Sequence, residues 1–109
     1  MARKFEFSVD MHVHSIYSGE SLARPRDIVE AALEKGLDAI CITEHESLSV
    51  SRPFEEFRGK TPLTILRGVE IATDSGHMLV YGVSDKEWGD WGKRCVCRAQ
   101  DLIDRVNLM

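Results

Sequence analysis

The chain has 109 residues, 43% of them hydrophobic and 29% charged, which is the composition expected of one soluble globular domain. Acidic residues outnumber basic ones 18 to 14, and the absence of a Lys or Arg run argues against a sequence-independent nucleic-acid clamp. The sequence shows neither an apolar run that could span a bilayer nor a signal peptide, so we expect a cytoplasmic protein with no membrane partner.

Apolar residues alternate from Phe5 to Val13, which predicts a strand with one apolar face. The opposite face would carry Asp10, His12 and His14 in a row. Because residues i and i+2 of a strand lie on the same side, the two imidazoles are expected to project together.

A loop over residues 16–24 is followed by a predicted helix over residues 25–35. Pro25 suits the first turn of that helix, and Gly36 is typical of its end. The apolar segment "LDAICIT", residues 37–43, predicts a buried strand that ends at "EHES". A strand, a helix and a strand in this order predict a βαβ unit with two parallel strands.

The remaining pattern predicts a short helix over residues 51–60, with Ser51 as a candidate cap, and a third strand over residues 63–73. The turn "DSG" and a fourth strand over residues 77–83 could complete a hairpin. Ser84 and Glu87 could form a capping box. A helical stripe follows, carried by Trp91, Cys95, Ala99, Leu102, Ile103 and Val106.

These four strands fall short of a closed parallel barrel, which has eight strands and roughly 250 residues. The chain is therefore either a smaller open sheet or a piece of something longer, and we favour the second interpretation. The three cysteines, Cys41, Cys95 and Cys97, are odd in number and argue against a disulfide framework. The lone CxC would point to different helix faces, so inert thiols are expected rather than a zinc pair.

The histidines fall where strands end. His14 and His45 follow two strands that should be neighbours, His77 opens the fourth strand, and Glu70 lies in the third. Ligands gather at the carboxyl ends of parallel strands, so these side chains can converge on one edge of the sheet. Imidazole and carboxylate together suit zinc, manganese or iron, and Glu70 could bridge two ions.

A single histidine beside a strand is more often a satisfied structural group than a ligand, and an HxH pair makes the two interpretations about even. Four histidines at strand ends with a strand-borne glutamate favour a metal site. Asp10 could serve only as a hydrogen-bond partner of a histidine N–H. Glu20 is equally a ligand or a loop carboxylate.

Other polar residues carry weaker signals. Glu44 and Glu46 flank His45 and are each expected to be solvated loop charges, and Asp74 is expected to form a turn. Arg67 could bind a substrate phosphate or pair with a surface acid. Trp88 and Trp91 are expected to be packing residues.

Three segments resemble the PHP domain (polymerase and histidinol phosphatase) superfamily. "DMHVHSIYS" resembles its first motif, Asp-x-His-x-His-Ser followed by an acid, and "ITEHES" resembles its second, usually Thr-Asp-His. "GVEIATDSGHMLVYGV" resembles the third, a Gly-x-Glu followed by a histidine that opens a strand. The motifs occur in the family's order, and the resemblance extends roughly from Phe5 to Val83.

The resemblance implies an α/β fold, the N-terminal part of a distorted (β/α)7 TIM-like barrel with a two- or three-metal centre. Glu70 would be the bridging carboxylate, and Glu70 and His14 would act in catalysis through a metal-activated water. Asp10 and Glu44 would support the ligands, and Glu44 replaces the family's usual Asp. The implied metal ligands are His12, His14, Glu20, His45, Glu70 and His77.

The family has a fourth motif and a late Asp-x-His pair, whereas this sequence has no histidine after His77. Residues 1–109 are thus expected to form a single partial PHP domain with motifs I–III. The first hypothesis is a metal-dependent phosphoesterase acting on a phosphorylated small molecule or a nucleotide. Because half a barrel would expose apolar surface, a homodimer or domain-swapped oligomer is expected.

Two alternatives stay open. An amidohydrolase-like metal hydrolase also opens with HxH, although the later motifs and the absence of a strand-borne Lys in mid-chain count against it. A non-catalytic metal-binding or interaction remnant would keep the ligands without turnover. Loss of weak phosphoesterase activity in His14→Ala would distinguish the first hypothesis from the remnant.

Overall fold

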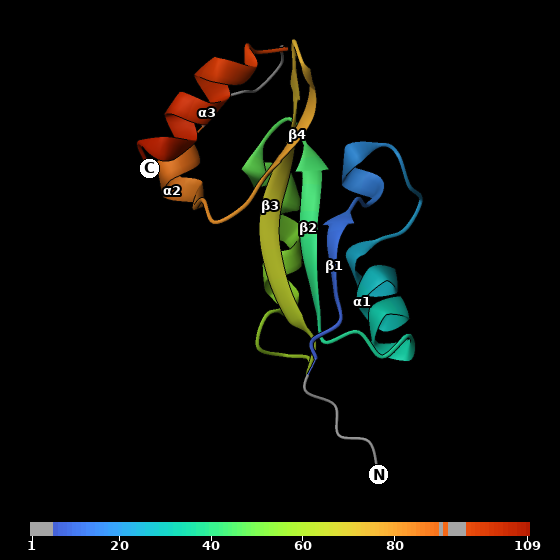
Figure 1. Cartoon of the computed structure of the whole chain (residues 1–109). Coiled ribbons are helices and arrows are strands. Elements are labelled where there is room, and N and C mark those ends of the chain that lie inside the picture. Colours follow the sequence, from blue (N-terminus) through green and yellow to red (C-terminus); the bar gives the residue numbers. More distant parts are fainter. Residues whose placement is uncertain (1–5, 90, 92–95) are drawn as a thin grey trace.

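A four-stranded sheet in the order β1-β2-β3-β4 forms the centre of the molecule (Figure 1). The computed structural model describes residues 6–89, 91 and 96–109. β1, β2 and β3 are parallel, and β4 pairs antiparallel with β3 as the predicted hairpin. The strands are β1 Val9–Val13, β2 Ala39–His45, β3 Thr64–Thr73 and β4 Gly76–Val80.

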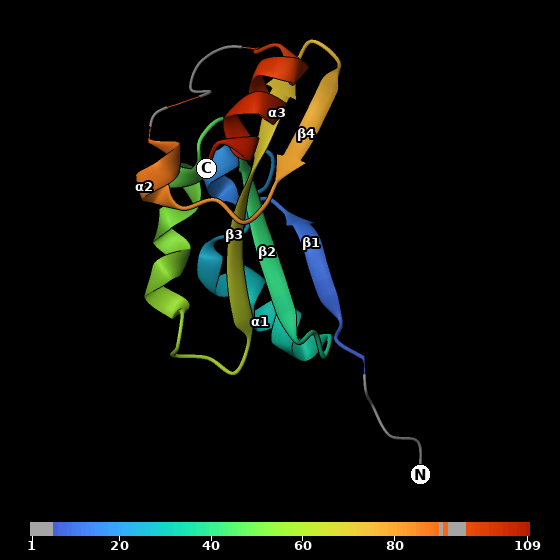
Figure 2. The same cartoon turned by 60° about the vertical axis from the view of Figure 1, so that its left-hand side comes forward.

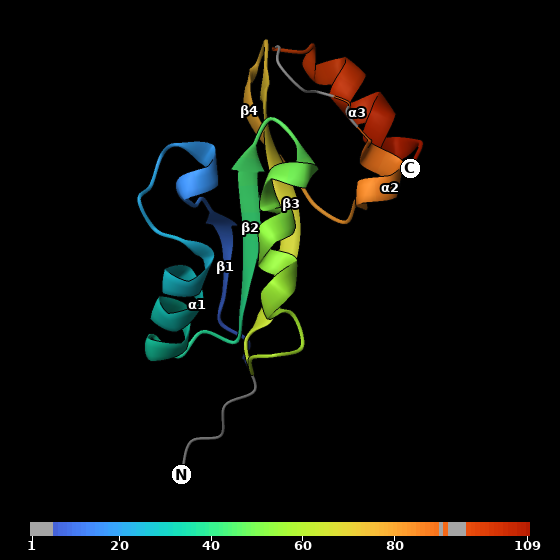
Figure 3. The same cartoon turned by 180° about the vertical axis from the view of Figure 1, so that it is seen from behind.

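Helices cover one face of the parallel strands, as Figure 3 shows from behind. Helix α1, Pro25–Glu34, links β1 to β2 and confirms the predicted βαβ unit, and the 3-10 helix η2, Leu48–Phe57, links β2 to β3. Each fully buried aliphatic or aromatic side chain here stabilises the fold by about 2 kcal/mol relative to exposure. The core on this face consists of Val29, Ala32, Ile40, Ile42, Phe54, Leu63 and Ile65.

A second core lies where α2, Asp85–Trp88, and α3, Ala99–Asn107, pack near the hairpin (Figure 2). Trp88 is fully buried, and its ring meets that of Trp91 edge-to-face at 5.4 Å, which confirms the predicted packing role. Ser84 caps α2 by accepting from the backbone N–H of Glu87, as its capping-box pattern predicts. This second core therefore packs the C-terminal helices against the C-terminal half of β3.

The other face of the sheet is open. Met11, Leu66 and Tyr81 are 43%, 42% and 38% exposed, and all three line one cavity of about 440 Å³. Together with the curl of the sheet, this open face gives the half-barrel shape that the resemblance implied. Among the described residues, no helix combines the length and apolar character needed to cross a membrane.

Several predicted boundaries were wrong. β1 begins at Val9 rather than near Phe5, which lies outside the described residues, and β2 runs on to include His45. The helix predicted at residue 51 begins at Leu48, because Ser47 caps it by accepting from the N–H of Ser49. The last helix begins only at residue 99, and residues 92–95 of its predicted stripe, Cys95 included, lie outside the described residues.

Candidate metal centre

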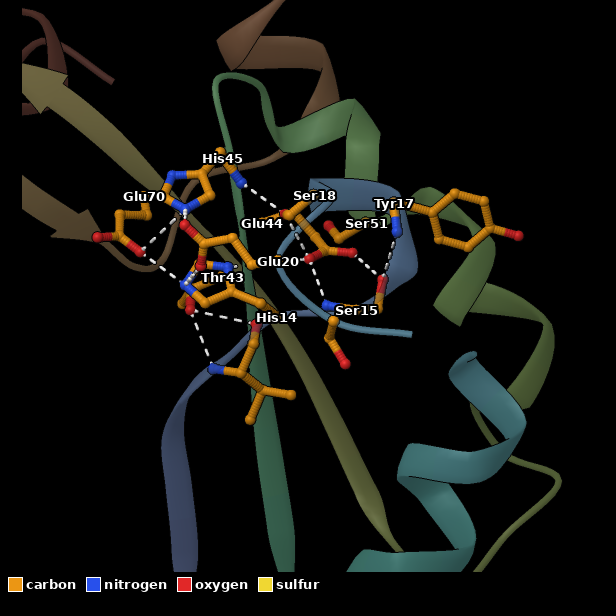
Figure 4. A network of polar contacts seen from close by, with 12 residues as sticks. His14, Ser15, Tyr17, Ser18, Glu20, Thr43, Glu44, His45, Ser51 and Glu70 are labelled. Carbon is orange, nitrogen blue, oxygen red and sulfur yellow. Dashed lines mark hydrogen bonds and ion pairs between the residues drawn. The ribbon is translucent and has the colours of Figure 1, made fainter. Parts of the chain in front are cut away.

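Four imidazoles and one buried carboxylate meet at the carboxyl edge of the sheet. Glu70 lies in β3 in register with His45, the last residue of β2. His12 comes from β1 and His14 directly follows it, while His77 lies in β4. Figure 4 shows His14, His45 and Glu70 pointing toward one another above the strand ends.

Glu70 is the common partner of this cluster. Its Oε1 lies 2.8 Å from His12 Nε2, 2.8 Å from His14 Nε2 and 3.9 Å from His45 Nε2. Its Oε2 lies 3.0 Å from His77 Nδ1. The two carboxylate oxygens therefore face different imidazoles, which is the arrangement a bridging ligand requires.

The carboxylate of Glu20 closes the cluster on the other side. It lies 2.7 Å from His45 Nε2 and 3.7 Å from His14 Nε2. The rings of His14 and His45 stack in parallel, with their centroids 4.5 Å apart. Glu20 reaches this position because η1, Ile16–Ser18, ends at Gly19 in the left-handed conformation, with φ 74°, and turns the chain back.

Glu44 is fully buried, so its prediction as a solvated loop charge was wrong. Its carboxylate accepts from the Ser15 N–H at 2.8 Å, from the Ser15 hydroxyl, and from the Ser18 hydroxyl at 2.6 Å. The Ser18 hydroxyl oxygen accepts in turn from the His45 N–H at 3.0 Å. This network, drawn in Figure 4, ties the loop that carries Glu20 to the end of β2.

A β-bulge in β1 interrupts the alternation that the sequence predicted. Asp10 is in register with Ile40 and Val13 with Ile42, so β1 has one residue more than β2 over this stretch. The Asp10 carboxylate accepts from the backbone N–H of His12 at 3.1 Å, and the structure thus places it on the backbone rather than on an imidazole.

Opposing influences act on the titration of Glu70. Burial of the carboxylate would raise its pKa, but hydrogen bonds from His12 and His77 and the charges of His12 and His45 hold the pKa of Glu70 below its usual range. Glu70 is therefore an anion at neutral pH, as a metal ligand must be.

Arg67 lies three residues before Glu70 but does not join the cluster. Its guanidinium donates to Ser51 Oγ, to the Leu48 carbonyl, to Glu55 and twice to Asp85. These five bonds use the whole donor set of an arginine, so the structure favours the ion-pair interpretation over phosphate binding.

The other predicted residues fall as follows. Glu46 is exposed, as expected, and Asp74 forms the β3–β4 turn while also accepting from the Ala99 N–H at the start of α3. Burial raises the pKa of the Cys41 thiol to about 11, which fits an inert thiol.

Sequence reasoning missed the supporting roles of Ser15, Ser18, Thr43 and Tyr81. For Ser15 alone a signal existed, because a serine follows the HxH pair in the first motif.

The donor set fits metal ions. Three groups of ligand atoms each lie within 4.8 Å of one another: His12, His14 and Glu70; His14, Glu20 and His45; His45, Glu70 and His77. Two ligands of one tetrahedral zinc ion are separated by roughly 3.4 Å, so small shifts would suffice for coordination.

The close contacts within the cluster also favour metal binding. His12 Nε2 and His14 Nε2 lie 3.0 Å apart while both approach Glu70 Oε1. If both nitrogens donate to that oxygen, two donors face each other, whereas an ion in place of the protons would satisfy all three atoms.

His14 Nδ1 is buried without a hydrogen-bond partner among the described residues, and Glu44 Oε1 lies 4.0 Å away. A slight shift would let Glu44 accept that N–H, as partners of metal-bound histidines commonly do.

Comparisons with known proteins agree with this geometry. A family model described as the PHP domain matches residues 10–102. A curated relative, an uncharacterized protein of Methanocaldococcus jannaschii, is 26% identical over 80 residues, covering 64% of this chain and 47% of the relative.

A solved structure is also similar. It is the crystal structure of a protein from Bifidobacterium adolescentis provisionally assigned as a metal-dependent phosphoesterase, with a TM-score of 0.58 and 31% identity. The match covers 67% of this chain and 27% of that protein. The chain thus matches about half the length of the curated relative and about a quarter of the solved one.

Proposed function

The chain belongs to the PHP domain family, and on this premise we propose that it supplies the metal centre of a metal-dependent phosphoesterase. The observation that carries the proposal is the position of Glu70, whose two oxygens face imidazoles from opposite edges of the sheet. The similarity to a protein assigned as a metal-dependent phosphoesterase supports the same activity.

We assign the ligands from the three groups of converging atoms, with Glu70 as the bridging carboxylate. Zinc, manganese and iron all suit a mixed imidazole and carboxylate set, and two or three ions fit the overlapping groups. Bound ions would lower the pKa of water and neutralise charge that develops at phosphorus. The proposed ligands are His12, His14, Glu20, His45, Glu70 and His77.

The side chains of the cluster leave a route for substrate. The His12 and His77 side chains are 50% and 55% exposed, whereas the side chain of Glu70 is 7% exposed. A phosphate ester can therefore approach from the histidine side while the bridging carboxylate stays shielded. The proposed substrate is the phosphate ester of a small molecule or a nucleotide.

Glu44 and Asp10 would orient the metal ligands through hydrogen bonds without binding the metal themselves. Glu44 holds the Ser15–Ser18 segment and so sets where Glu20 meets His45. Asp10 holds the backbone N–H of His12. Neither carboxylate belongs to a converging ligand group, so both are assigned to orientation rather than to coordination.

The test is metal content by ICP-MS on the purified protein, followed by hydrolysis of p-nitrophenyl phosphate with added zinc, manganese or iron. We expect at least one ion per chain, and activity that His14→Ala abolishes while the exposed-residue control Glu46→Gln preserves it. No bound metal after loading with excess ions would contradict the proposal.

Metal binding without turnover would favour the non-catalytic alternative instead. The comparison gives this non-catalytic alternative a basis, because the similarity covers only 27% of the solved relative. We propose accordingly that residues 1–109 contain the part of a PHP domain that bears its first three motifs.

A second copy of this chain is the proposed partner for the open face, as a homodimer or by exchange of elements. Apolar side chains on this face are exposed, and β4 pairs only with residues 69–73 of β3, leaving residues 64–68 without a strand on that side among the described residues. Native mass spectrometry should show a dimer. A stable monomer with a weak ANS signal would contradict this assignment.

A further inference from the structure

The two edge strands of the sheet are joined by one side chain across its open face. Tyr81 directly follows β4, and its hydroxyl donates to the backbone carbonyl of Met11 in β1 at 2.7 Å. These residues are 70 positions apart in the sequence, and β1 and β4 are the outer strands. We propose that Tyr81 is a positioning residue of the metal centre, because its hydroxyl fixes the bulge of β1 and thereby the place where His12 meets Glu70.

The bulge matters because it determines how the β1 histidines are aimed. The extra residue lies between Asp10 and Val13, the stretch that contains Met11 and His12. Bulges re-aim side chains and leave backbone groups without ladder partners, so their geometry depends on what satisfies those groups.

Side chains from three elements satisfy the backbone of this bulge. The Asp10 carboxylate accepts from the His12 N–H at 3.1 Å, and Thr43 Oγ1 accepts from the Val13 N–H at 3.1 Å. Tyr81 binds the Met11 carbonyl, the group directly before His12 in the chain. Of these three, only Tyr81 comes from the far edge of the sheet, so it alone relates the position of β1 to that of β4, which carries His77.

Gly68 makes the crossing possible. A Cβ added there would lie 2.5 Å from the Val80 carbonyl oxygen and 3.1 Å from Tyr81 Cδ1. Backbone cannot yield as a flexible side-chain end can, so any larger residue would push the end of β4 and the Tyr81 ring away. Gly68 also lies two residues before Glu70 on the same strand, directly below the metal centre.

Tyr81 is available as a donor at neutral pH. Partial burial, with smaller contributions from the charges of Cys41, Glu70 and Asp10, raises the pKa of its phenol. The hydroxyl therefore keeps its proton, and Tyr81→Phe removes one hydrogen bond while leaving the ring in place over Gly68.

The experiment compares wild type with Tyr81→Phe and, as a matched control, Tyr17→Phe, which alters the only other tyrosine. Co²⁺ titration followed by its visible spectrum measures affinity and ligand geometry. Long-range ¹H–¹⁵N spectra of the histidine rings, recorded without metal, measure the placement of His12 directly. The metal readout rests on the proposed function, whereas the metal-free readout does not.

In Tyr81→Phe we expect about tenfold weaker Co²⁺ binding, the lower range for partners of metal ligands, with an altered spectrum at saturation and shifted His12 ring signals. Tyr17→Phe should match wild type in both readouts. Gly68→Ala should reproduce the Tyr81→Phe shifts, because the added Cβ would displace the Tyr81 ring and so break the same hydrogen bond to Met11. Failure of wild type to bind Co²⁺ would reject the proposed function alone, and the ring spectra would still test Tyr81.

Unchanged ring signals and affinity in Tyr81→Phe would overturn the inference. So would an affinity loss that only follows the fraction of unfolded protein, measured by near-UV circular dichroism. A positioning role requires the change in His12 to appear in protein that is fully folded.

Discussion

Arg67 and Glu70 lie three residues apart on β3, and their side chains are almost equally buried, at 8% and 7% exposure. Their surroundings differ in kind. Arg67 has five donors and five hydrogen bonds, with both of its carboxylate partners supplied by the chain. Glu70 faces four imidazoles, which crowd against one another as well as against the carboxylate.

The difference separates a structural cluster from a functional one. The Arg67 cluster is complete, because each polar group has a partner of opposite character and nothing further is needed. In the Glu70 cluster, imidazole nitrogens and carboxylate oxygens converge so closely that protons cannot give each of them a well-placed hydrogen bond. Metal cations can bind the lone pairs of all these atoms at once. Burial does not distinguish the two clusters, but the balance of donors and acceptors does.

The largest expected effect comes from Glu70→Gln, which breaks the functional cluster. Replacing the shared carboxylate removes the ligand common to two of the three groups, so we expect affinity for Zn²⁺ or Mn²⁺ to fall by about 100-fold or more. Isothermal titration calorimetry measures this change. The thermal midpoint without metal should stay near that of wild type, and a large fall in it would show that Glu70 is mainly structural.

Arg67→Met tests the other side of the comparison. The guanidinium is buried, but the side chains of its carboxylate partners Glu55 and Asp85 are 39% and 35% exposed. We therefore expect a loss of about 2 kcal/mol in the free energy of unfolding. Urea denaturation measures the loss. Metal affinity should not change, and a fall like that of Glu70→Gln would mean that the two clusters are coupled.

Glu44→Gln sharpens the comparison within the metal centre. Glu44 is buried and accepts three hydrogen bonds from Ser15 and Ser18, and an amide can accept at only one of its two ends. The loop that carries Glu20 should loosen, with a fall in metal affinity of about tenfold. Glu46→Gln, two residues on and exposed, is the matched control. Equal affinities in the two variants would contradict the orienting role of Glu44.

The sequence predicted the βαβ unit, the hairpin and the convergence of the histidines, because strand periodicity and strand-end placement are local patterns. It also located Glu70, a glutamate within the predicted third strand and close to the histidines at the strand ends. The Ser84 cap was confirmed, because its hydroxyl accepts from the Glu87 N–H within one turn. The full capping box was not, because the Glu87 carboxylate accepts from the Ser84 hydroxyl and not from the Ser84 backbone N–H.

The rest depends on contacts between distant segments. Glu44 looked solvated because its partners, Ser15 and Ser18, lie 29 and 26 residues away. Likewise, the bulge in β1 emerges only from its register with β2, and Arg67 could be distinguished from a phosphate ligand only once α2 and η2 were placed around it. Periodicity carries no information about such pairings.

The smallest expected effect is the pH dependence of the Arg67 cluster. The Arg67 hydrogen bond, opposed by some burial, holds the pKa of Asp85 below its usual range. A lowered folded-state pKa stabilises the fold above the unfolded value of about 3.9, and this stability is lost as pH falls through the lower folded value. Because the Asp85 side chain is 35% exposed, screening limits the contribution to about 1 kcal/mol or less.

Urea midpoints between pH 7 and pH 2 measure this contribution. Asp85→Asn should lower stability at neutral pH and flatten the decline below pH about 4, because the variant has no proton to gain at that position. Asp101→Asn is the control, since Asp101 lies 4.0 Å from Arg98 in a pair whose side chains are both more than half exposed, and it should keep the wild-type slope. An unchanged acid slope in Asp85→Asn would mean that Glu55 alone balances Arg67. Hydrogen bonds would then stabilise the Arg67 cluster more than charge pairing does. The Arg67 and Glu70 clusters would differ in how many hydrogen-bond partners each group has, and not in how their charges are balanced.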